Sequence, residues 1–250
     1  MTKQINPEIF NDMINHSENI VFFGGAGVST ESGIPDFRSQ DGIYNSSHSY
    51  PPEMILSHSF FVSRTDEFYR FYKEKMIYLN SLPNACHRLL SIWEATGKLK
   101  GIITQNIDNL HQMAGSFNVI ELHGSIYRNH CQKCGKFYDV AAVLYTTGIP
   151  KCDCGGIIKP DVVLYEETLD NDKIKAAIKL IEQADILIIG GTSLSVYPAA
   201  QLVNYYRGDK MILVNKNKSS FDRNADFVFY GPIADFFAKT AQIGQINHDS

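Results

Sequence analysis

Four short apolar runs, separated by helical segments, most constrain what this chain can fold into. They cover residues 20–24, 101–105, 185–190 and 211–215. Such continuous, β-branched runs are typical of parallel strands buried on both faces of a sheet. Helix-start signals lie between or after them, at Thr65, Asn84 and Pro232. This alternation predicts an α/β fold with an open, doubly wound parallel sheet.

Two segments do not fit the alternation. One covers residues 40–83 and begins with a stretch rich in Ser, Pro and His, and the other covers residues 124–160 and contains four of the five cysteines. We expect both to be insertions that form a smaller lobe, the first helical and the second metal-binding. The large domain is then built from residues 1–39, 84–123 and 161–250.

The bulk composition limits the partners. A formal charge of -4 gives no general attraction to nucleic acid or to an anionic membrane. The apolar runs are shorter than the roughly 18 residues of a membrane-spanning helix, and the first ten residues do not resemble a signal peptide. We therefore expect a cytoplasmic monomer without nucleic-acid or membrane partners.

The cysteine spacing predicts a structural zinc site. Cys131 and Cys134 form one pair, Cys152 and Cys154 form a second, and glycines follow each pair where tight turns are needed. Four thiolates complete a tetrahedral zinc shell and leave no position for a reactive water. The alternative is a set of redox-active or unligated cysteines, since the second pair has only one intervening residue. Cys86 is expected to be a buried small hydrophobe.

The first apolar run ends in a glycine-rich loop that resembles part of a dinucleotide fingerprint. The backbone N–H groups of Gly25, Ala26 and Gly27 are expected to face a pyrophosphate, helped by the start of a following helix. Thr30 stands where the fingerprint has its third glycine. The loop also lacks the lysine of a triphosphate-binding P-loop, which argues against a kinase or NTPase.

Polar segments follow the apolar runs. They are residues 104–115, 121–125, 190–200 and 214–220. Ligands of open α/β sheets bind outside the carboxyl ends of the strands. The sequence therefore predicts one nucleotide-binding cleft lined by these segments and by the first loop.

Together these motifs resemble those of the sirtuins, the NAD-dependent protein lysine deacylases, in their bacterial form. The matching segments read GAGVSTESGIPDFR, TQNIDNLHQMAG, ELHGS, the two cysteine pairs, GTSLSVYPAA and LVN. The resemblance is collinear from about residue 20 to residue 236. It implies a Rossmann-type domain with a zinc-bearing small lobe, with NAD as co-substrate and acyl-lysine proteins as partners. The acyl group, acetyl or another uncharged one, would pass to ADP-ribose with release of nicotinamide.

The resemblance also implies roles for individual residues. His123 matches the general base, and Asn106 the residue that positions the nicotinamide ribose and a nearby water. The implied NAD contacts are Ala26, Thr30, Phe37, Arg38, Gln105, Ile107, Asp108, His123, Thr192, Ser193, Asn215 and Ile233. The implied contacts of the substrate peptide are Val163, Tyr165, Ser195, Val196 and Tyr197.

One departure from the family pattern is visible at residues 165–167, where Tyr-Glu-Glu replaces the usual Phe-Gly-Glu. The side chain of Glu166 at the glycine position could alter the approach of the peptide or favour basic substrates. Three other functions remain as alternatives. They are NAD-dependent mono-ADP-ribosyl transfer, a non-catalytic NAD-sensing module and a hydride-transferring dehydrogenase.

Overall fold

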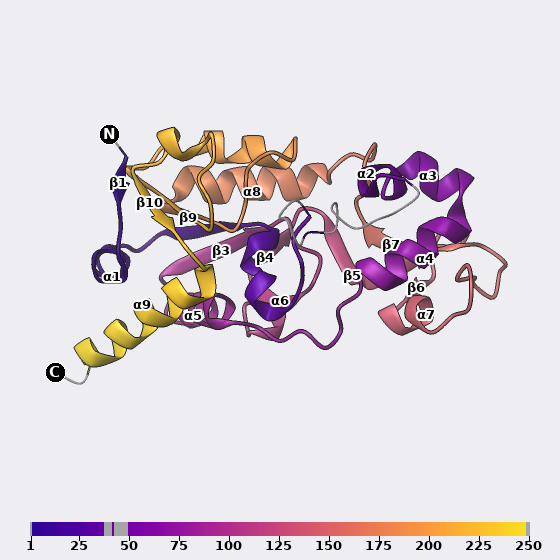
Figure 1. Cartoon of the computed structure of the whole chain (residues 1–250), viewed down its shortest axis with the longest axis horizontal. Coiled ribbons are helices and arrows are strands. Elements are labelled where there is room, and N and C mark those ends of the chain that lie inside the picture. Colours follow the sequence, from indigo (N-terminus) through magenta and orange to yellow (C-terminus); the bar gives the residue numbers. More distant parts are fainter. Residues whose placement is uncertain (1, 38–41, 43–49, 249–250) are drawn as a thin grey trace.

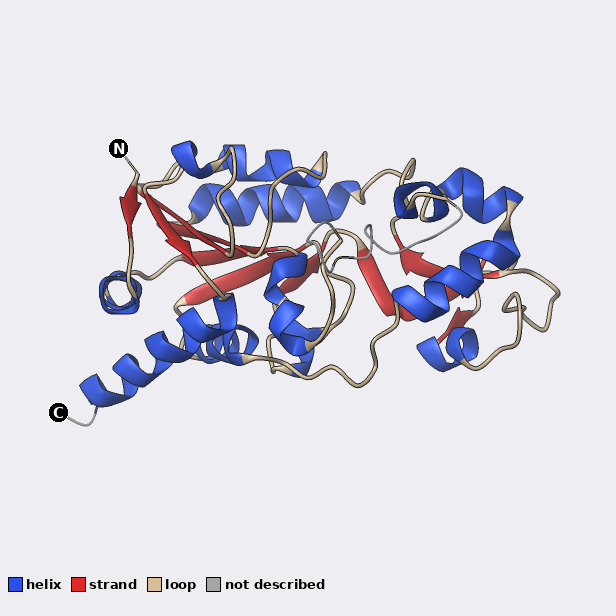
Figure 2. Cartoon of the chain, viewed as in Figure 1, coloured by secondary structure: helices blue, strands red, loops and turns tan. Residues whose placement is uncertain are grey.

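A large lobe and a smaller lobe lie end to end along the long axis of the molecule (Figure 1). The structure is a computed structural model that describes residues 2–37, 42 and 50–248, with side chains described as far as Gly244. In the large lobe a single sheet lies between two layers of helices (Figure 2). The predicted α/β fold with a doubly wound parallel sheet is confirmed.

The large sheet has seven strands in the order β1-β10-β9-β8-β2-β3-β4, and every neighbouring pair is parallel. All four predicted strands are present, as β2, β3, β8 and β9. The bounds are β1 Lys3–Gln4, β2 Ile20–Gly24, β3 Leu99–Thr104, β4 Val119–Glu121, β8 Ile186–Gly190, β9 Lys210–Asn215 and β10 Phe227–Tyr230. The remaining three strands lie at or next to the sheet edges, and two of them are too short for an apolar pattern.

Helices cover both faces of this sheet. One face packs against α1 (Pro7–Asn15), α5 (Ala85–Ala95) and α9 (Ile233–His248), and the other against α8 (Asn171–Gln183) and the 3-10 helix η4 (Ala199–Tyr205). The short elements of this lobe are η1 Ala26–Val28, η2 Thr30–Ser32, α6 Leu110–Met113 and η5 Asp222–Asn224.

Strand β2 shows why the apolar runs are continuous. Ile20 and Phe22 point into the core that includes α1, α5 and α9, whereas Val21 and Phe23 point into the core beneath α8 and η4. All four side chains are at most 1% exposed. Because successive side chains of a strand alternate between faces, a central strand covered on both sides needs an apolar residue at every position.

Helix α5 begins as expected, with the Asn84 side chain accepting from the Cys86 N–H at 3.0 Å. Helix α4 differs from the expectation. Thr65 is its first helical residue and not its cap, because the Thr65 hydroxyl donates back to the Phe61 carbonyl at 2.7 Å. Cys86 is fully buried, as predicted.

The smaller lobe combines helices with a three-stranded antiparallel sheet in the order β6-β5-β7. Its elements are α2 Pro52–Ile55, α3 His58–Ser63, α4 Thr65–Lys75, β5 Gly124–Cys131, β6 Phe137–Tyr138, α7 Val140–Leu144 and β7 Ile158–Val162. An aromatic core of Phe61, Phe68, Tyr69 and Tyr72 joins the helices to this sheet. The expected domain boundaries remain a prediction, and strand β7 continues just past the one at residue 160.

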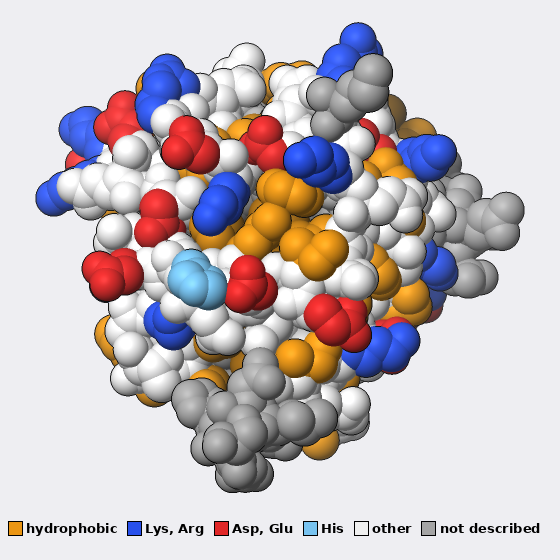
Figure 3. Space-filling view, turned by 90° about the vertical axis from the view of Figure 1, so that its left-hand side faces the viewer, with side chains coloured by type: hydrophobic (Ala, Val, Ile, Leu, Met, Phe, Trp, Pro, Cys, Tyr) orange, Lys and Arg blue, Asp and Glu red, His pale blue; other side chains and the backbone are white. Residues whose placement is uncertain are grey.

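The end of the molecule that carries both termini shows side chains of both charge signs around a limited apolar area (Figure 3). The coloured part of this face therefore presents no large field of one sign. Among the residues that the structure describes, no helix is both long and apolar enough to cross a membrane.

Two histidines are buried beside each other in the large lobe. His87 and His111 are 0% and 1% exposed, and their ring centroids lie 4.7 Å apart. The Asn84 N–H donates to His87 Nδ1 at 3.2 Å, which requires that nitrogen to be unprotonated. Burial lowers the pKa of His87 to about 4 and, with His87 as neighbour, lowers the pKa of His111 well below its usual value. Both rings are neutral in the folded protein, as expected of structural histidines.

This pair should make the fold sensitive to acid. A histidine whose pKa is lowered on folding contributes stability that is present above about pH 6.5 and is lost as the pH falls toward the folded-state pKa. For His87 the loss by pH 4 is about 3 kcal/mol. The measurement is the free energy of unfolding as a function of pH. In His111→Leu this free energy should fall less steeply between pH 6.5 and 5 than in the wild type.

His16→Leu removes an exposed imidazole and serves as the matched control. An identical pH dependence in wild type and His111→Leu would contradict this account.

Candidate functional site

The carboxyl ends of the central strands meet at one edge of the sheet. Gly24 at the end of β2 pairs in register with Thr104 of β3 and with Gly190 of β8, and Gly190 pairs with Val214 of β9. The loops that leave these strands surround a cavity of about 770 Å³ between the two lobes. This is where the sequence placed a nucleotide-binding cleft.

Most of the predicted site residues line this cavity together. The predicted catalytic residues Asn106 and His123 line it, as do the other predicted NAD contacts Ala26, Thr30, Phe37, Gln105, Ile107, Asp108, Thr192, Ser193, Asn215 and Ile233. The predicted peptide contacts that line it are Val163, Tyr165, Val196 and Tyr197. Ser195 is not among the lining residues, and its hydroxyl lies 2.6 Å from that of Ser193. Arg38 lies outside the described residues.

Residues 25–37, the described part of the chain directly after β2, contain no α-helix, contrary to the expectation for the first loop. The chain instead makes two single turns of 3-10 helix, η1 and η2, before Pro35. A regular helix with its dipole aimed at the ligand is therefore not part of this loop.

Two of the three predicted phosphate donors in the first loop have another partner. The N–H groups of Gly25 and Gly27 donate to the carbonyls of Gly190 and Gly191 at 3.1 and 2.8 Å. A Cβ added to Gly27 would lie 2.8 Å from the Gly191 Cα, so the two loops touch backbone to backbone. The phosphate-facing role therefore remains a prediction for the Ala26 amide alone, and the glycines serve close approach of the loops.

Asp108 anchors the loop that follows β3. Its carboxylate accepts from the Ser29 hydroxyl at 2.6 Å and from the Leu110 N–H at 3.0 Å. The Asn106 amide donates to the same Ser29 hydroxyl at 3.1 Å. Burial raises the pKa of Asp108, although the hydrogen bonds from Ser29 and from the Leu110 N–H oppose the rise. Asn106 and Asp108 are thus fixed relative to each other through Ser29.

His123 enters the cavity at the point where β5 begins. His123 Nδ1 lies 2.9 Å from the Gln105 carbonyl oxygen. Because a carbonyl only accepts, Nδ1 carries the proton and the neutral ring leaves Nε2 with a free lone pair. Burial lowers the pKa of His123, and the hydrogen bond to Gln105 partly opposes this. The imidazole is therefore neutral at pH 7 and able to accept a proton.

Asn215 also lines the cavity, and its side-chain amide is hydrogen-bonded to backbone. Asn215 Oδ1 accepts from the Thr192 N–H at 3.0 Å, and Asn215 Nδ2 donates to the Thr192 carbonyl at 3.1 Å. The Gln105 side chain donates to the Thr192 hydroxyl at 3.3 Å. Asn215 therefore braces the loop that carries Thr192 and Ser193.

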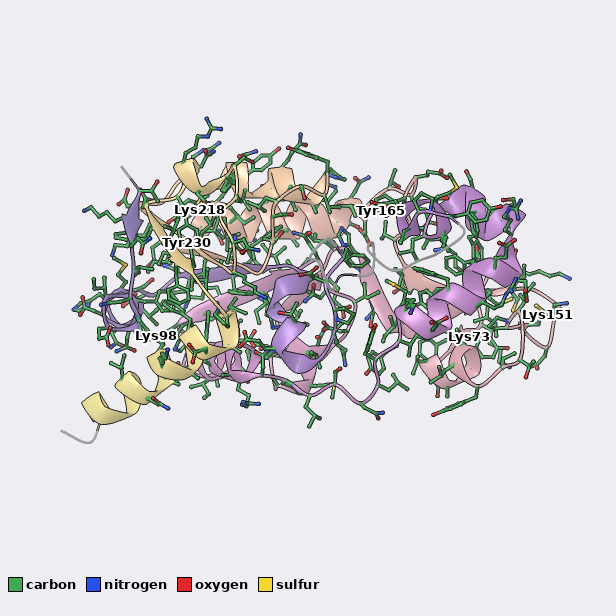
Figure 4. All side chains as sticks on the ribbon, in the orientation of Figure 1. Lys73, Lys98, Lys151, Tyr165, Lys218 and Tyr230 are labelled. Atoms are coloured by element: carbon green, nitrogen blue, oxygen red, sulfur yellow. The ribbon has the colours of Figure 1, made fainter. Side chains whose placement is uncertain are left out.

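The predicted peptide-binding segment is held from both sides. The Val163 N–H donates to the His123 carbonyl at 3.0 Å, which ties the segment to the candidate base. The Tyr165 N–H donates to Leu56, and the Tyr165 carbonyl accepts from the His58 N–H, each at 2.9 Å. Tyr165 thus sits between the lobes (Figure 4). Tyr197, on the opposite segment, is 69% exposed.

Two features of the site were not predicted from the sequence. Ser29 is 1% exposed and joins Asn106 to Asp108, but a serine inside a glycine-rich loop carries no distinctive signal. Arg128 of β5 pairs with both Glu121 and Asp161 at 2.8 Å, and so links the end of β4 to β5 and β7. Asp161 is 33 residues from Arg128 in sequence, so periodicity does not reveal this link.

The four paired cysteines come together in the smaller lobe. Their sulfur atoms all lie within 4.8 Å of one another, with Cys131 to Cys154 at 3.5 Å and Cys134 to Cys152 at 3.6 Å. A tetrahedral shell with Zn–S bonds of about 2.3 Å needs sulfur–sulfur distances of about 3.8 Å. The cluster therefore fits a structural zinc ion held by four thiolates.

Cys131→Ser should lower zinc content and stability together, because the metal joins the two turns that carry the cysteine pairs. We expect zinc well below one per chain and a loss of about 4 kcal/mol or more in the free energy of unfolding. Metal analysis and chemical denaturation measure these. Cys86→Ala is the control that removes a thiol outside the cluster and should keep its zinc. The assignment would be refuted by wild-type protein that lacks stoichiometric zinc and whose stability does not change when a chelator is added.

Comparison with known proteins now identifies the family. Residues 25–198 match the Sir2 family. A protein of Clostridium tetani named NAD-dependent protein deacetylase is 58% identical over 87% of this chain and 90% of its own. A protein of the same name from Clostridium perfringens is 57% identical over 91% of this chain and 95% of its own.

Solved structures agree with this match. A Sir2 structure with deacetylated p53 peptide and 3′-O-acetyl-ADP-ribose superimposes with a TM-score of 0.88 at 38% identity, over 96% of this chain and 99% of its own. A Sir2 structure with p53 peptide and NAD⁺ gives 0.85 at 38% identity, over 97% and 100%. The extent of these matches in sequence and in structure shows that this chain belongs to the Sir2 family.

Proposed function

We propose that this chain is an NAD-dependent protein lysine deacetylase. The observation that carries the proposal is a single cleft in which His123, Asn106 and Asp108 meet at the carboxyl ends of the strands. Relatives of the same family, more than half identical, are named NAD-dependent protein deacetylases. The reaction takes NAD, an acyl-lysine protein and water, releases nicotinamide and the free lysine side chain, and moves the acyl group to ADP-ribose.

The chemistry places two demands on the cleft. Breaking the bond between nicotinamide and ribose leaves positive charge on the ribose, so water must be kept away while the acyl oxygen takes the C1′ position. Phe37 and Ile107 supply apolar cover on one side of the cavity. Asp108 would accept from the nicotinamide carboxamide, and its hydrogen bonds with the Ser29 hydroxyl and the Leu110 N–H support this role by holding the carboxylate in place.

The second demand is a base for the ribose hydroxyl that attacks the bound acyl group. His123 meets it, because its Nδ1–H is held by the Gln105 carbonyl and its Nε2 is free to take the proton. Asn106, fixed by its amide on Ser29 and by its N–H on the Thr104 hydroxyl, holds the ribose and a water nearby. Val163 connects this base to the peptide-binding segment.

The main alternative, mono-ADP-ribosyl transfer to protein, uses the same first cleavage. It does not need the base, and its product keeps the ADP-ribose on protein. The presence of His123 in the cleft and the deacetylase relatives favour acyl transfer. Mass spectrometry of product from labelled NAD separates the two, because the label leaves as acyl-ADP-ribose in one and stays on protein in the other.

The cytoplasm is the proposed location, because reducing conditions keep four free thiolates available to zinc. That the chain acts as a monomer, without nucleic-acid or membrane partners, remains a prediction.

His123→Ala should abolish most turnover without unfolding the protein. A positioned base contributes about 10² to 10⁴ in rate, so we expect a loss of that order in kcat for deacetylation of an acetyl-peptide. NAD binding by calorimetry and the thermal melting curve should stay close to wild type. His16→Ala, at an exposed helix end, is the matched control and should be fully active. Near-wild-type kcat in His123→Ala would remove the assignment.

The pH profile provides an independent check on His123. Because burial lowers its pKa, the base form persists below the ordinary histidine value of about 6.5. The acidic limb of kcat/KM for the peptide should therefore lie below pH 6.5, with a plateau from there through pH 8. Rates are measured over a few minutes. The control for acid damage is the recovery of activity after the enzyme is returned to pH 7.5. A limb centred at or above pH 6.5 is the contrary result.

A further inference from the structure

Glu166 adopts a backbone conformation that an L-residue rarely takes. Its φ is 75°, and only Asn109 and Leu194 share this feature among the non-glycine residues that the structure describes. Glycine reaches this region without strain, whereas a side chain crowds the backbone there. The sirtuin pattern has glycine at this position, so the glutamate must be held by contacts of its own side chain.

Ser59 supplies those contacts. Glu166 Oε2 accepts from the Ser59 N–H at 2.9 Å and from the Ser59 hydroxyl at 2.6 Å. The neighbouring backbones also pair, since Ser57 and Tyr165 form a parallel bridge. The Glu166 carboxylate is thus fixed at the junction of the lobes, at the end of the peptide-binding segment and on the wall of the cavity.

The neighbouring carboxylate is already compensated. Glu167 lies 3.1 Å from Lys159 Nζ and 2.9 Å from His58 Nδ1, and it accepts from the Leu164 N–H at 2.9 Å. Glu166, in contrast, makes no ion pair with any described residue. Its Ser59 hydrogen bonds lower its pKa, so the carboxylate is charged at neutral pH. One exposed negative charge without an ion pair among the described residues therefore borders the proposed entry of the peptide, with His58 as its weaker electrostatic neighbour.

Other charges on the cavity wall do not cancel it. Lys75 pairs with Glu74 at 2.9 Å, and Glu31 is occupied by the Ala234 N–H at 2.6 Å. Lys216 and Lys218 line the cavity beside Asn215, at the end of β9. The charge of Glu166 thus stands out on the side where the peptide is proposed to bind.

We propose that Glu166 is a specificity-determining residue that favours acyl-lysine peptides with a lysine or arginine flanking the acyl-lysine. The proposal rests on the proposed deacetylase function. A substrate strand paired along residues 163–167 brings its flanking side chains past the fixed carboxylate, while its main chain provides binding that does not depend on sequence. A basic flanking side chain gains an ion pair there, and an acidic one is repelled.

The test is a panel of acetyl-lysine peptides that differ only in carrying Arg, Gln or Glu at one of the two positions before or after the acetyl-lysine. For the wild type, kcat/KM for the best Arg peptide should exceed that for the matching Glu peptide by about fivefold, as exposed ion pairs allow. The difference should appear in the KM for peptide and not in the KM for NAD. It should also shrink at high salt, because exposed charges are screened.

Glu166→Gln tests the charge at nearly constant shape. The Arg-to-Glu ratio of kcat/KM should fall toward one, through the KM for the two charged peptides. Because the φ value strains any side chain, Glu166→Gly is a second variant that folds without this cost and should lose the preference equally. Glu182→Gln, on the exposed surface of α8, is the matched control and should keep the wild-type ratio.

The outcomes separate the two proposals. A wild-type enzyme that deacetylates all peptides equally, or variants that keep the wild-type ratio, would overturn the role of Glu166 and leave the deacetylase function standing. A wild-type protein that deacetylates none of the peptides with NAD present would instead remove the proposed function itself.

Discussion

The parallel pairing of β2 with β3 and β8 is the constraint on which the rest of the structure depends. All three strands run in one direction and in close register, so their carboxyl ends lie at one level. The loops after Gly24, Thr104 and Gly190 must therefore lie next to one another at the same edge of the sheet. Direct backbone hydrogen bonds from Gly25 and Gly27 to the β8 loop then set the distance between these loops. The cavity is the space that this arrangement leaves.

The smaller lobe is linked to that edge through backbone as well as side chains. The Ile126 N–H donates to the Ile107 carbonyl at 3.1 Å, and Arg128 joins the end of β4 to β7. Strand β5 runs from Gly124, beside the candidate base, to Cys131 of the cysteine cluster. A zinc ion with four thiolate ligands has no open coordination position for catalysis, but it can still stabilise the lobe that forms one wall of the active site.

Much of the fold was predictable because it depends on local patterns. A strand buried on both faces needs an unbroken apolar run, and a helix cap such as Asn84 needs a short polar side chain. A zinc site with four thiolate ligands needs cysteines in closely spaced pairs. The polar segments after the strands also identified the cleft correctly. Failures occurred where a distant partner decides the outcome. The amides of Gly25 and Gly27 were expected to bind phosphate but donate to the carbonyls of Gly190 and Gly191. The two 3-10 turns η1 and η2 stand in place of the expected helix.

The sequence by itself determined the sheet and the zinc ligands, because both follow from residue type and spacing along the chain, and its resemblance to the sirtuins pointed to the candidate base. Only the tertiary structure decided which atoms of these residues remain available. It fixed the His123 tautomer through the Gln105 carbonyl, turned Asn215 toward the Thr192 backbone, and held Glu166 at a positive φ by hydrogen bonds to Ser59. Each of these contacts joins residues far apart in sequence, and hydrogen bonding across such distances is set by packing and not by local pattern.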